Sequence, residues 1–267
     1  MADVVIDARG VSKRFYLRHN RTNELKVRFL AMFDVGKREV LEEFWALKDV
    51  SFTVRQGEAV ALVGRNGSGK STLLKIIAGL HLPTAGQLLV APHARIGTMI
   101  ELGVGFHPEL SGTENVFLNA SVYGLSREEI SSLYPAIVEY AGLRHFMEQP
   151  LKNFSSGMGA RLGFAIAAHL NPDILLMDEV FTVGDAEFQE QCLATLRAMR
   201  EKGKTLIFVS HVPKAVQDMC DRACVLEQGH LVFDGPVDAG LEAYERLRDV
   251  AAPVVAVPGT ERDGSTP

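Results

Sequence analysis

The stretch at residues 64–71, GRNGSGKS, constrains the fold most strongly because it matches the pattern G-x-x-x-x-G-K-[ST]. It follows a short apolar run, AVALV at residues 59–63, and precedes a helical pattern of leucine and isoleucine that runs through Ile77. This order predicts a buried strand, a tight loop and a helix. Backbone N–H groups of such a loop turn inward around phosphate oxygens, and the start of the helix adds its dipole. The lysine and serine favour this phosphate site over a glycine-rich turn that binds nothing.

Three polar residues at the end of the loop have expected contacts. Lys70 is expected to reach the β- and γ-phosphates of a nucleotide, and Ser71 to offer its hydroxyl to Mg²⁺. Thr72 is expected to add a further hydroxyl contact to the phosphates. The nucleotide-binding residues predicted in this stretch are Gly64, Asn66, Gly67, Gly69, Lys70, Ser71 and Thr72.

Two further apolar runs, ILLM at residues 174–177 and TLIFV at residues 205–209, are each followed by polar residues and then a helical stretch. Repeated strand-then-helix order predicts an α/β fold with a mainly parallel sheet. Asp178 and Glu179 come directly after the first run, at the carboxyl end of the predicted strand, where open α/β sheets bind ligands. Asp178 is expected to hold Mg²⁺, directly or through water, and Glu179 to polarise the attacking water.

The N-terminal part has a different pattern. Strand-like alternation at residues 4–6 and again at residues 44–54 predicts an N-terminal antiparallel β edge. Between them lies an irregular insertion, residues 17–43, with apolar residues near helical spacing. We expect an amphipathic surface helix that packs on its own domain, and the alternative is a contact with a membrane surface or a partner.

Strand signals vanish between about residues 97 and 172, where helical patterns dominate. This indicates a helical subdomain, about 97–172, inserted in the α/β core. Residues 1–250 are therefore expected to form one domain. Residues 251–267 are rich in proline, glycine and small polar side chains, which predicts a disordered tail.

The composition argues against several kinds of function. A net charge of −5 and an isoelectric point near 5.9 disfavour nucleic-acid binding by bulk electrostatics, because such binding needs clustered Lys and Arg. Cys192, Cys220 and Cys224 form no CxxC pair and are expected to be small buried residues in a reducing compartment. The N-terminus lacks a signal-peptide pattern and no apolar run reaches about 18 residues. We therefore expect a cytosolic chain whose membrane role would come through a partner.

A second candidate anion site is FSSGM at residues 154–158, just before the helical run RLGFAIAAHL. Ser155, Ser156 and Gly157 would cap the N-terminus of that helix. The start of a helix with small residues binds anions, and ordinary helix capping explains the same residues equally well. This stretch alone does not separate the two interpretations.

Taken together, the motifs resemble those of ABC-type ATPases over nearly all of residues 4–247. GRNGSGKS corresponds to the Walker A loop, FSSGM to the signature and ILLMDE to Walker B, and VGD and SH follow in the family's order. The resemblance implies a P-loop NTPase core of ABC type that binds ATP and Mg²⁺. It also implies head-to-tail pairs, with each ATP between the Walker A of one copy and the signature of the other. On that basis Ser155 and Gly157 would touch the γ-phosphate across the dimer. Asp185 would lie at the shared interface, and His211 would contact the γ-phosphate and help organise attack.

Two further site residues come from the same resemblance. The family stacks adenine on an aromatic ring near the first strand, where VSKRFY offers Phe15 or Tyr16, and Phe15 occupies the usual position. Glu101 stands where most members have a glutamine that touches Mg²⁺ and begins the loop facing the membrane subunit. A carboxylate can accept from metal-bound water, although it adds negative charge beside the triphosphate. The expected catalytic residues are Lys70, Glu179 and His211, and the expected metal ligands are Ser71, Asp178 and Glu101.

Departures from the common motifs point to one branch of the family. Ser156 replaces the first glycine of the usual signature, Met158 its glutamine, and Val180 the proline after the catalytic acid. FWALKDVSF, IELGVGFHPELSGTEN and SSGMGARLGFAIA look like the ATP-binding subunits that export bacterial O antigen, capsule and teichoic acid. The resemblance implies an ATPase that is peripheral to the cytoplasmic face of the inner membrane. It would form a homodimer with two copies of a polytopic permease that handles most of the lipid-linked polysaccharide, and it would have no nucleic-acid partner.

The stretch TMIELGVGFHPELSGTEN, residues 98–115, has no clear helix or strand period. The resemblance makes it the coupling segment, in which Gly103 and Gly105 permit movement. Its Phe106 and Pro108 would then meet the membrane partner. A structural loop that closes the helical subdomain is the alternative.

Two other classes of function share the nucleotide chemistry. A soluble ABC ATPase that acts on ribosomes or DNA usually carries tandem domains, long coiled coils or basic extensions, none of which the sequence shows. A regulatory nucleotide-binding module with little turnover would not need both Glu179 and His211. The export subunit is therefore the main hypothesis, and an ATPase with a ribosome or DNA partner is the alternative.

Overall fold

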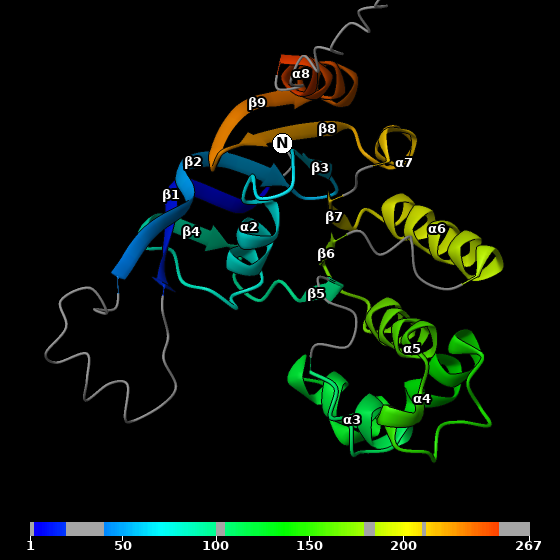
Figure 1. Cartoon of the computed structure of the whole chain (residues 1–267). Coiled ribbons are helices and arrows are strands. Elements are labelled where there is room, and N and C mark those ends of the chain that lie inside the picture. The colour runs from blue at the N-terminus through cyan, green and yellow to red at the C-terminus, as the bar shows by residue number, and fades with distance from the viewer. Residues whose placement is uncertain (1–2, 20–39, 100–104, 179–184, 210–211, 251–267) are drawn as a thin grey trace, which may run out of the picture.

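The structure is a computed structural model that describes residues 3–19, 40–99, 105–178, 185–209 and 212–250. Among these residues the core is a six-stranded sheet in the order β5-β6-β7-β3-β8-β9 (Figure 1). The strands are β3 (Ala59–Val63), β5 (Ile96–Met99), β6 (Ile174–Asp178), β7 (Thr205–Val209), β8 (Arg222–Glu227) and β9 (His230–Pro236). Neighbouring strands from β5 to β8 run parallel, and β9 is antiparallel to β8. The predicted mainly parallel α/β sheet is confirmed.

The three runs predicted as buried strands lie side by side at the centre of this sheet, as β6, β7 and β3. Every residue of β3 and β7 is buried. Alternate side chains of a strand point to opposite faces, and β3 contributes to two hydrophobic cores, one on each face of the sheet. Ala61 and Val63 join one core, whereas Val60 and Leu62 join the other. A strand covered on both faces has no polar positions, which explains its unbroken apolar sequence.

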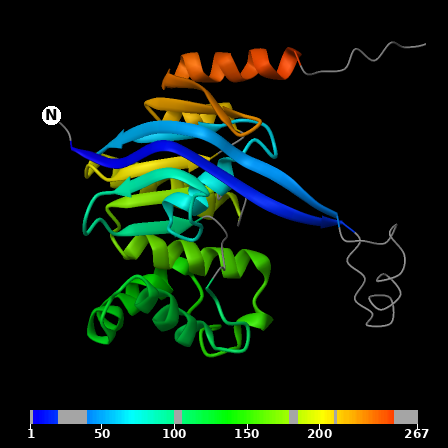
Figure 2. The same ribbon diagram turned by 90° about the vertical axis from the view of Figure 1, so that its left-hand side faces the viewer.

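A second sheet has the order β2-β1-β4 and is antiparallel throughout its described pairs. Its strands are β1 (Val4–His19), β2 (Val40–Arg55) and β4 (Ala85–Val90). The predicted N-terminal antiparallel edge is therefore confirmed, and it is longer than expected. The ends of β1 and β2 reach away from the rest of the fold as a two-stranded ribbon (Figure 2).

The expectation of an irregular insertion at residues 17–43 is partly wrong. Its two ends continue the strands, because β1 runs to His19 and pairs there with Val40 of β2. Residues 20–39, where the amphipathic helix was expected, lie outside the described residues. The pairing of β1 with β2 decides the conformation of these ends, and such pairing is not visible in a local pattern.

The helical subdomain gathers below the core sheet in both views (Figures 1 and 2). Its elements are α3 (Gly112–Val122), α4 (Arg127–Ala141), the 3₁₀ turn η2 (Leu151–Asn153) and α5 (Ser156–His169). Strand structure ends at Met99, two residues after the boundary expected at about Gly97, because Gly97 lies in the short strand β5. A Cβ on Gly97 would lie 2.9 Å from Cγ of Pro172, so the glycine lets this short strand pack closely. Its four residues are too few to show a period.

The remaining helices cover the faces of the two sheets. They are α2 (Lys70–Ile77), α6 (Ala186–Glu201), α7 (Pro213–Met219) and α8 (Val237–Val250). No helix within the described ranges is both long enough and apolar enough to cross a bilayer. The three cysteines are buried as predicted, and burial raises the pKa of the Cys192 and Cys220 thiols to about 12.

The described part of the stretch at residues 98–115 is held by one buried amide. Asn115 is fully buried, and its Oδ1 accepts a 2.7 Å hydrogen bond from the backbone N–H of His107. Its Nδ2 donates to the carbonyls of His107, Leu110 and Ser111 at 2.9–3.1 Å. Ser111 in turn forms a capping box with Glu114 at the start of α3. The loop from His107 to Ser111 is therefore closed on itself around a single side chain.

Replacing Asn115 with alanine is expected to destabilise the domain by about 1–3 kcal/mol, because three carbonyls and one N–H would lose a buried partner. Urea unfolding of the full chain measures this as a lower midpoint with an unchanged slope. Asn119→Ala, one turn later on the same helix, is the matched control and is expected to change the midpoint little. Equal midpoints for the two variants would contradict this role of Asn115.

Candidate nucleotide-binding site

The loop between β3 and α2 is shaped by glycines that no other residue can replace. Gly64 and Gly69 have φ angles of +155° and +109°, which L side chains rarely adopt. A Cβ on Gly64 would lie 2.2 Å from the carbonyl oxygen of Leu226, and one on Gly69 would lie 2.5 Å from that of Ala46. The loop is therefore pressed between the end of β8 and the strand β2. Both glycines are required sterically as well as conformationally.

Lys70 begins α2 and points back into the loop that precedes it. The residue is only 6% exposed, and its Nζ donates to the carbonyls of Gly64 at 2.7 Å and Arg65 at 3.0 Å. A buried ammonium that is surrounded by loop backbone attracts an anion strongly, because little water screens it. The N-terminus of α2 adds its dipole at the same point.

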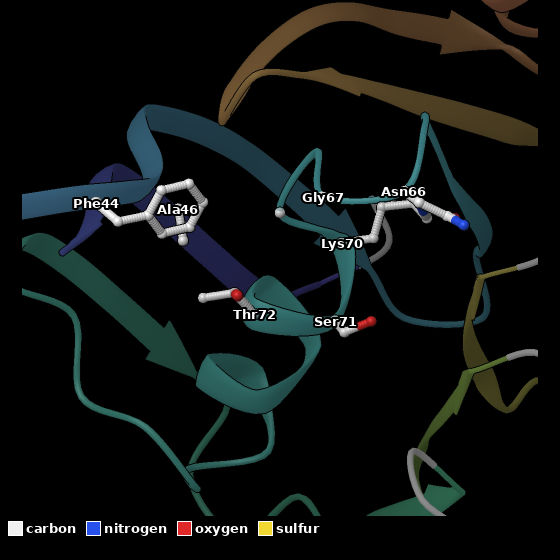
Figure 3. A pocket seen from close by; sticks show the side chains of 8 residues that line it. Phe44, Ala46, Asn66, Gly67, Lys70, Ser71 and Thr72 are labelled. Atoms are coloured by element: carbon white, nitrogen blue, oxygen red, sulfur yellow. The ribbon is translucent and has the colours of Figure 1, made fainter. Parts of the chain in front are cut away.

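A pocket of about 320 Å³ opens in front of this loop (Figure 3). It is lined by Phe44, Ala46, Asn66, Gly67, Gly69, Lys70, Ser71 and Thr72. Six of the seven loop residues predicted to bind nucleotide therefore surround one cavity, and the seventh, Gly64, accepts the Lys70 hydrogen bond from behind. The buried Oγ of Ser68, in the same loop, has no hydrogen-bond partner among the described protein groups.

The expected metal ligands Ser71 and Asp178 lie next to each other. Ser71 Oγ, on α2, donates a 2.9 Å hydrogen bond to Asp178 Oδ2 at the carboxyl end of β6, 107 residues away in sequence. A hydroxyl and a carboxylate beside a phosphate site form the donor set that Mg²⁺ uses, with waters and phosphate oxygens completing its six ligands. The described residues thus fit Mg²⁺ bound together with a triphosphate. They contain no group of three or more His, Cys, Asp or Glu that could hold a metal alone.

The remaining expected site residues are the catalytic residues Glu179 and His211 and the metal ligand Glu101. All three lie outside the described residues. Two described residues come shortly before the two catalytic residues in the sequence. Asp178 directly precedes Glu179 and ends β6, and Val209 lies two residues before His211 and ends the adjacent strand β7. Their roles therefore stay predictions from the sequence.

The aromatic side chain at the pocket is Phe44, which the sequence analysis missed. Neither Phe15 nor Tyr16 lines the pocket. Phe15 pairs across the ribbon with Phe44, and directly paired residues of antiparallel strands share a face of the sheet. Tyr16 points to the other face, where the Arg14 guanidinium lies 5.0 Å from its ring centroid. For the ring that stacks on adenine, the structure therefore favours Phe44, with Phe15 beside it, over Tyr16.

The signature residues Ser155 and Gly157 and the expected interface residue Asp185 do not line the pocket of their own copy. Ser155 is the N-cap of α5, where its Oγ accepts a 3.2 Å hydrogen bond from the backbone N–H of Met158. Gly157 lies in the first turn of that helix. Asp185 is the N-cap of α6, and its Oδ1 accepts from the N–H of Phe188 at 2.9 Å. Within one copy, Ser155 and Asp185 act as helix caps and Gly157 belongs to the first turn of α5.

Comparisons with known proteins agree with this geometry. The sequence model described as ABC transporter matches residues 47–182. The O-antigen export system ATP-binding protein RfbB of Klebsiella pneumoniae is 42% identical over 244 residues, which cover 91% of this chain and 98% of the relative. The teichoic acids export ATP-binding protein TagH of Listeria monocytogenes serotype 4b is 37% identical over 245 residues, 92% of this chain and 71% of the relative.

Solved structures share the fold. A dimeric post-hydrolysis state of the ATP-binding cassette MJ0796 bound to ADP and Pi superposes with a TM-score of 0.68 at 24% identity. A second dimeric structure of MJ0796, a bacterial ABC transporter cassette, gives a TM-score of 0.67 at 25% identity. Each comparison covers 87% of this chain and 98% of the other.

Proposed function

The chain belongs to the ABC transporter family, and we propose that it is the ATP-hydrolysing subunit of a transporter that exports a lipid-linked surface polysaccharide. The observation that carries the export assignment is the match to RfbB along 98% of that relative's length, with TagH matching as well. The hydrolysis assignment rests on the buried Lys70 and on the contact between Ser71 and Asp178 beside the phosphate loop.

ATP would bind in the pocket in front of the phosphate loop. The loop amides and Lys70 would hold the β- and γ-phosphates, and Ser71 and Asp178 would hold Mg²⁺, which neutralises charge on the phosphates when bound. Glu179 would take a proton from the attacking water and His211 would hold the γ-phosphate in position. Glu101 would accept a hydrogen bond from water near the metal. Hydrolysis in this arrangement depends mainly on positioning and electrostatics.

Two copies would close head to tail around two nucleotides. Ser155, Gly157 and Asp185 would then complete the site of the partner copy, across the shared interface. Two observations support this arrangement: the three residues lie away from the pocket of their own copy, and the solved cassettes with this fold are described as dimeric. The first turn of α5 would direct backbone N–H groups at the γ-phosphate of the partner's nucleotide, as the start of a helix does for a bound anion.

Phe44 would provide the surface on which adenine stacks, with Phe15 beside it. Replacing Phe44 with alanine is expected to weaken ATP binding up to about tenfold, because an aromatic contact contributes about 0.5–1.5 kcal/mol. Isothermal titration of the full chain with ATP measures this. Tyr16→Ala is the matched control and is expected to bind ATP like the unmodified chain, since its ring lies on the other face. A greater loss in Tyr16→Ala than in Phe44→Ala would contradict the assignment.

The subunit would work at the cytoplasmic face of the inner membrane, bound to a polytopic permease present in two copies. The permease would handle most of the lipid-linked polysaccharide. Residues 1–250 would form the ATP-binding domain, and the stretch at residues 98–115 would couple it to the permease. The loop around Asn115 supports this role because a closed loop can transmit force without deforming. The reported relatives give no support to a ribosome or DNA partner.

Affinity purification tests the export assignment. The chain is tagged in its native host, the membranes are solubilised gently, and the proteins that co-purify are identified by mass spectrometry. We expect one polytopic permease in an amount equal to that of the tagged chain. Recovery of ribosomal or DNA-bound proteins without a permease would contradict export and leave the ATPase chemistry standing.

A further inference from the structure

Three helices meet at an aromatic cluster where the helical subdomain touches the core. Tyr140 comes from α4, Phe164 from α5 and Phe188 from α6. The rings of Tyr140 and Phe164 are stacked with centroids 5.9 Å apart, and Phe188 meets both edge-on at 6.1 and 5.9 Å. Phe164 and Phe188 are almost fully buried. Such ring pairs favour fixed orientations, so the cluster restricts rotation of the three helices against one another.

Tyr140 adds a polar connection from α4 to α6. Its hydroxyl lies 2.7 Å from Oγ1 of Thr195 and donates to the carbonyl of Gln191 at 3.3 Å. Burial raises the pKa of Tyr140 to about 12, so the hydroxyl stays protonated at physiological pH. A hydrogen bond to a partly buried hydroxyl has a fixed direction, which a purely apolar contact lacks. The connection therefore sets the register of α4 along α6.

Arg161 connects α5 to the beginning of α6. Its guanidinium lies 4.9 Å from the ring centroid of Phe188, and its Nη1 is 3.5 Å from Oδ2 of Asp185. It also packs on the end of α4, where a Cβ on Gly142 would lie 3.1 Å from Nη2. An ion pair to a carboxylate as exposed as that of Asp185 contributes little by itself. The stacking on Phe188 and the carboxylate together fix the plane of the guanidinium.

Arg161 lies close to the starts of both α5 and α6. Ser155 caps the start of α5, and Arg161 is on the same helix less than two turns later, about 9 Å along its axis. At its other side Arg161 contacts Asp185, the residue that caps α6. One side chain therefore lies between the two helix starts that would face the partner's nucleotide.

We propose that Tyr140, Arg161, Phe164 and Phe188, here called the three-helix joint, hold the start of α5 and Asp185 as one rigid unit that meets the partner copy. Arg161 is the positioning residue of this joint. The inference rests on the proposed head-to-tail dimer. In this proposal the joint aligns the signature residues at the start of α5 with Asp185 before the two copies close.

The joint and the phosphate-loop pocket share no lining residue. Loosening the joint therefore leaves nucleotide binding by a single copy unchanged and weakens only the closure of two copies. A general loss of stability would lower both quantities. This separation makes the role of the joint measurable.

The test uses the full chain with Mg²⁺ and a slowly hydrolysed ATP analogue. Nucleotide affinity is measured at a protein concentration where single copies dominate, and dimer dissociation is measured by analytical ultracentrifugation. For Arg161→Gln and for Tyr140→Phe we expect about tenfold weaker dimerisation and nucleotide affinity within about twofold of the unmodified chain. The double variant is expected to lose less than the product of the two single effects, because both changes loosen the same joint.

Arg246→Gln is the matched control. Arg246 pairs with Glu242 on the exposed face of α8, away from the joint, and its replacement is expected to leave both constants unchanged. Unchanged dimerisation in both Arg161→Gln and Tyr140→Phe overturns the inference, as does a parallel loss of nucleotide affinity. If the unmodified chain binds no nucleotide or does not dimerise with it, the proposed function fails and the inference fails with it. If the unmodified chain does both and the variants match it, only the inference fails.

Discussion

Lys70→Ala is expected to hydrolyse ATP about 10²–10³-fold more slowly than the unmodified chain. The ammonium of Lys70 is buried in the phosphate loop, and two backbone carbonyls fix its position there. A cation held in a site with little water stabilises developing charge on phosphate far more than an exposed one. Phosphate release at saturating ATP and Mg²⁺ measures the loss.

Lys75→Ala is the control for this prediction, because Lys75 is on the same helix but does not line the pocket. We expect its hydrolysis rate to match that of the unmodified chain. Thermal unfolding of both variants shows whether the fold is retained, since the loop carbonyls also lose a partner when Lys70 is removed. Near-normal hydrolysis by a folded Lys70→Ala variant would refute the role of this side chain.

Glu179→Gln is expected to bind ATP and dimerise, yet to turn over about 10²–10⁴-fold more slowly. The amide keeps the size of the side chain but cannot accept a proton from water. The ATP-bound dimer should therefore accumulate and elute from a size-exclusion column as a species of twice the mass. Glu187→Gln, at an exposed position in the first turn of α6, is the matched control. It should hydrolyse ATP normally and therefore should not accumulate as the ATP-bound dimer.

This second prediction rests on sequence order, because Glu179 lies outside the described residues. The preceding residue, Asp178, occupies the carboxyl end of a parallel strand and contacts Ser71 at the phosphate loop. A variant that hydrolyses ATP at the normal rate would assign the proton transfer to another group. A variant that fails to bind ATP would instead indicate a structural role for the carboxylate.

Local order in the sequence was sufficient to predict the phosphate loop. The strand, the glycines and the helix are consecutive, so the positions of Gly69, Lys70 and Ser71 follow from chain connectivity alone. The contact between Ser71 and Asp178 was also predictable, because parallel strands bring their carboxyl ends to one edge of the sheet. Both features follow from the strand-loop-helix order and from the parallel sheet, which the sequence motifs indicate directly.

The features that the sequence did not reveal depend on pairing between distant segments. The face on which Phe15, Tyr16 and Phe44 lie is fixed by the register of β1 with β2, and a slip of one residue would exchange the faces. The short strand β5 was missed because four residues are too few to show a period, and the close packing of its glycine against Pro172 leaves no local pattern. Arg161 lies within a helical run, and nothing in that run indicates its contact with the N-cap of α6.

The central claim is that ATP hydrolysis by this chain drives the export of a surface polysaccharide. The most direct test places Lys70→Ala in the chromosomal gene of the native host and quantifies polysaccharide on the cell surface together with lipid-linked polysaccharide inside the cell. The account predicts that the surface polymer is lost while the lipid-linked form accumulates on the cytoplasmic side. A normal amount of surface polysaccharide in cells that make the variant at the usual level would contradict it.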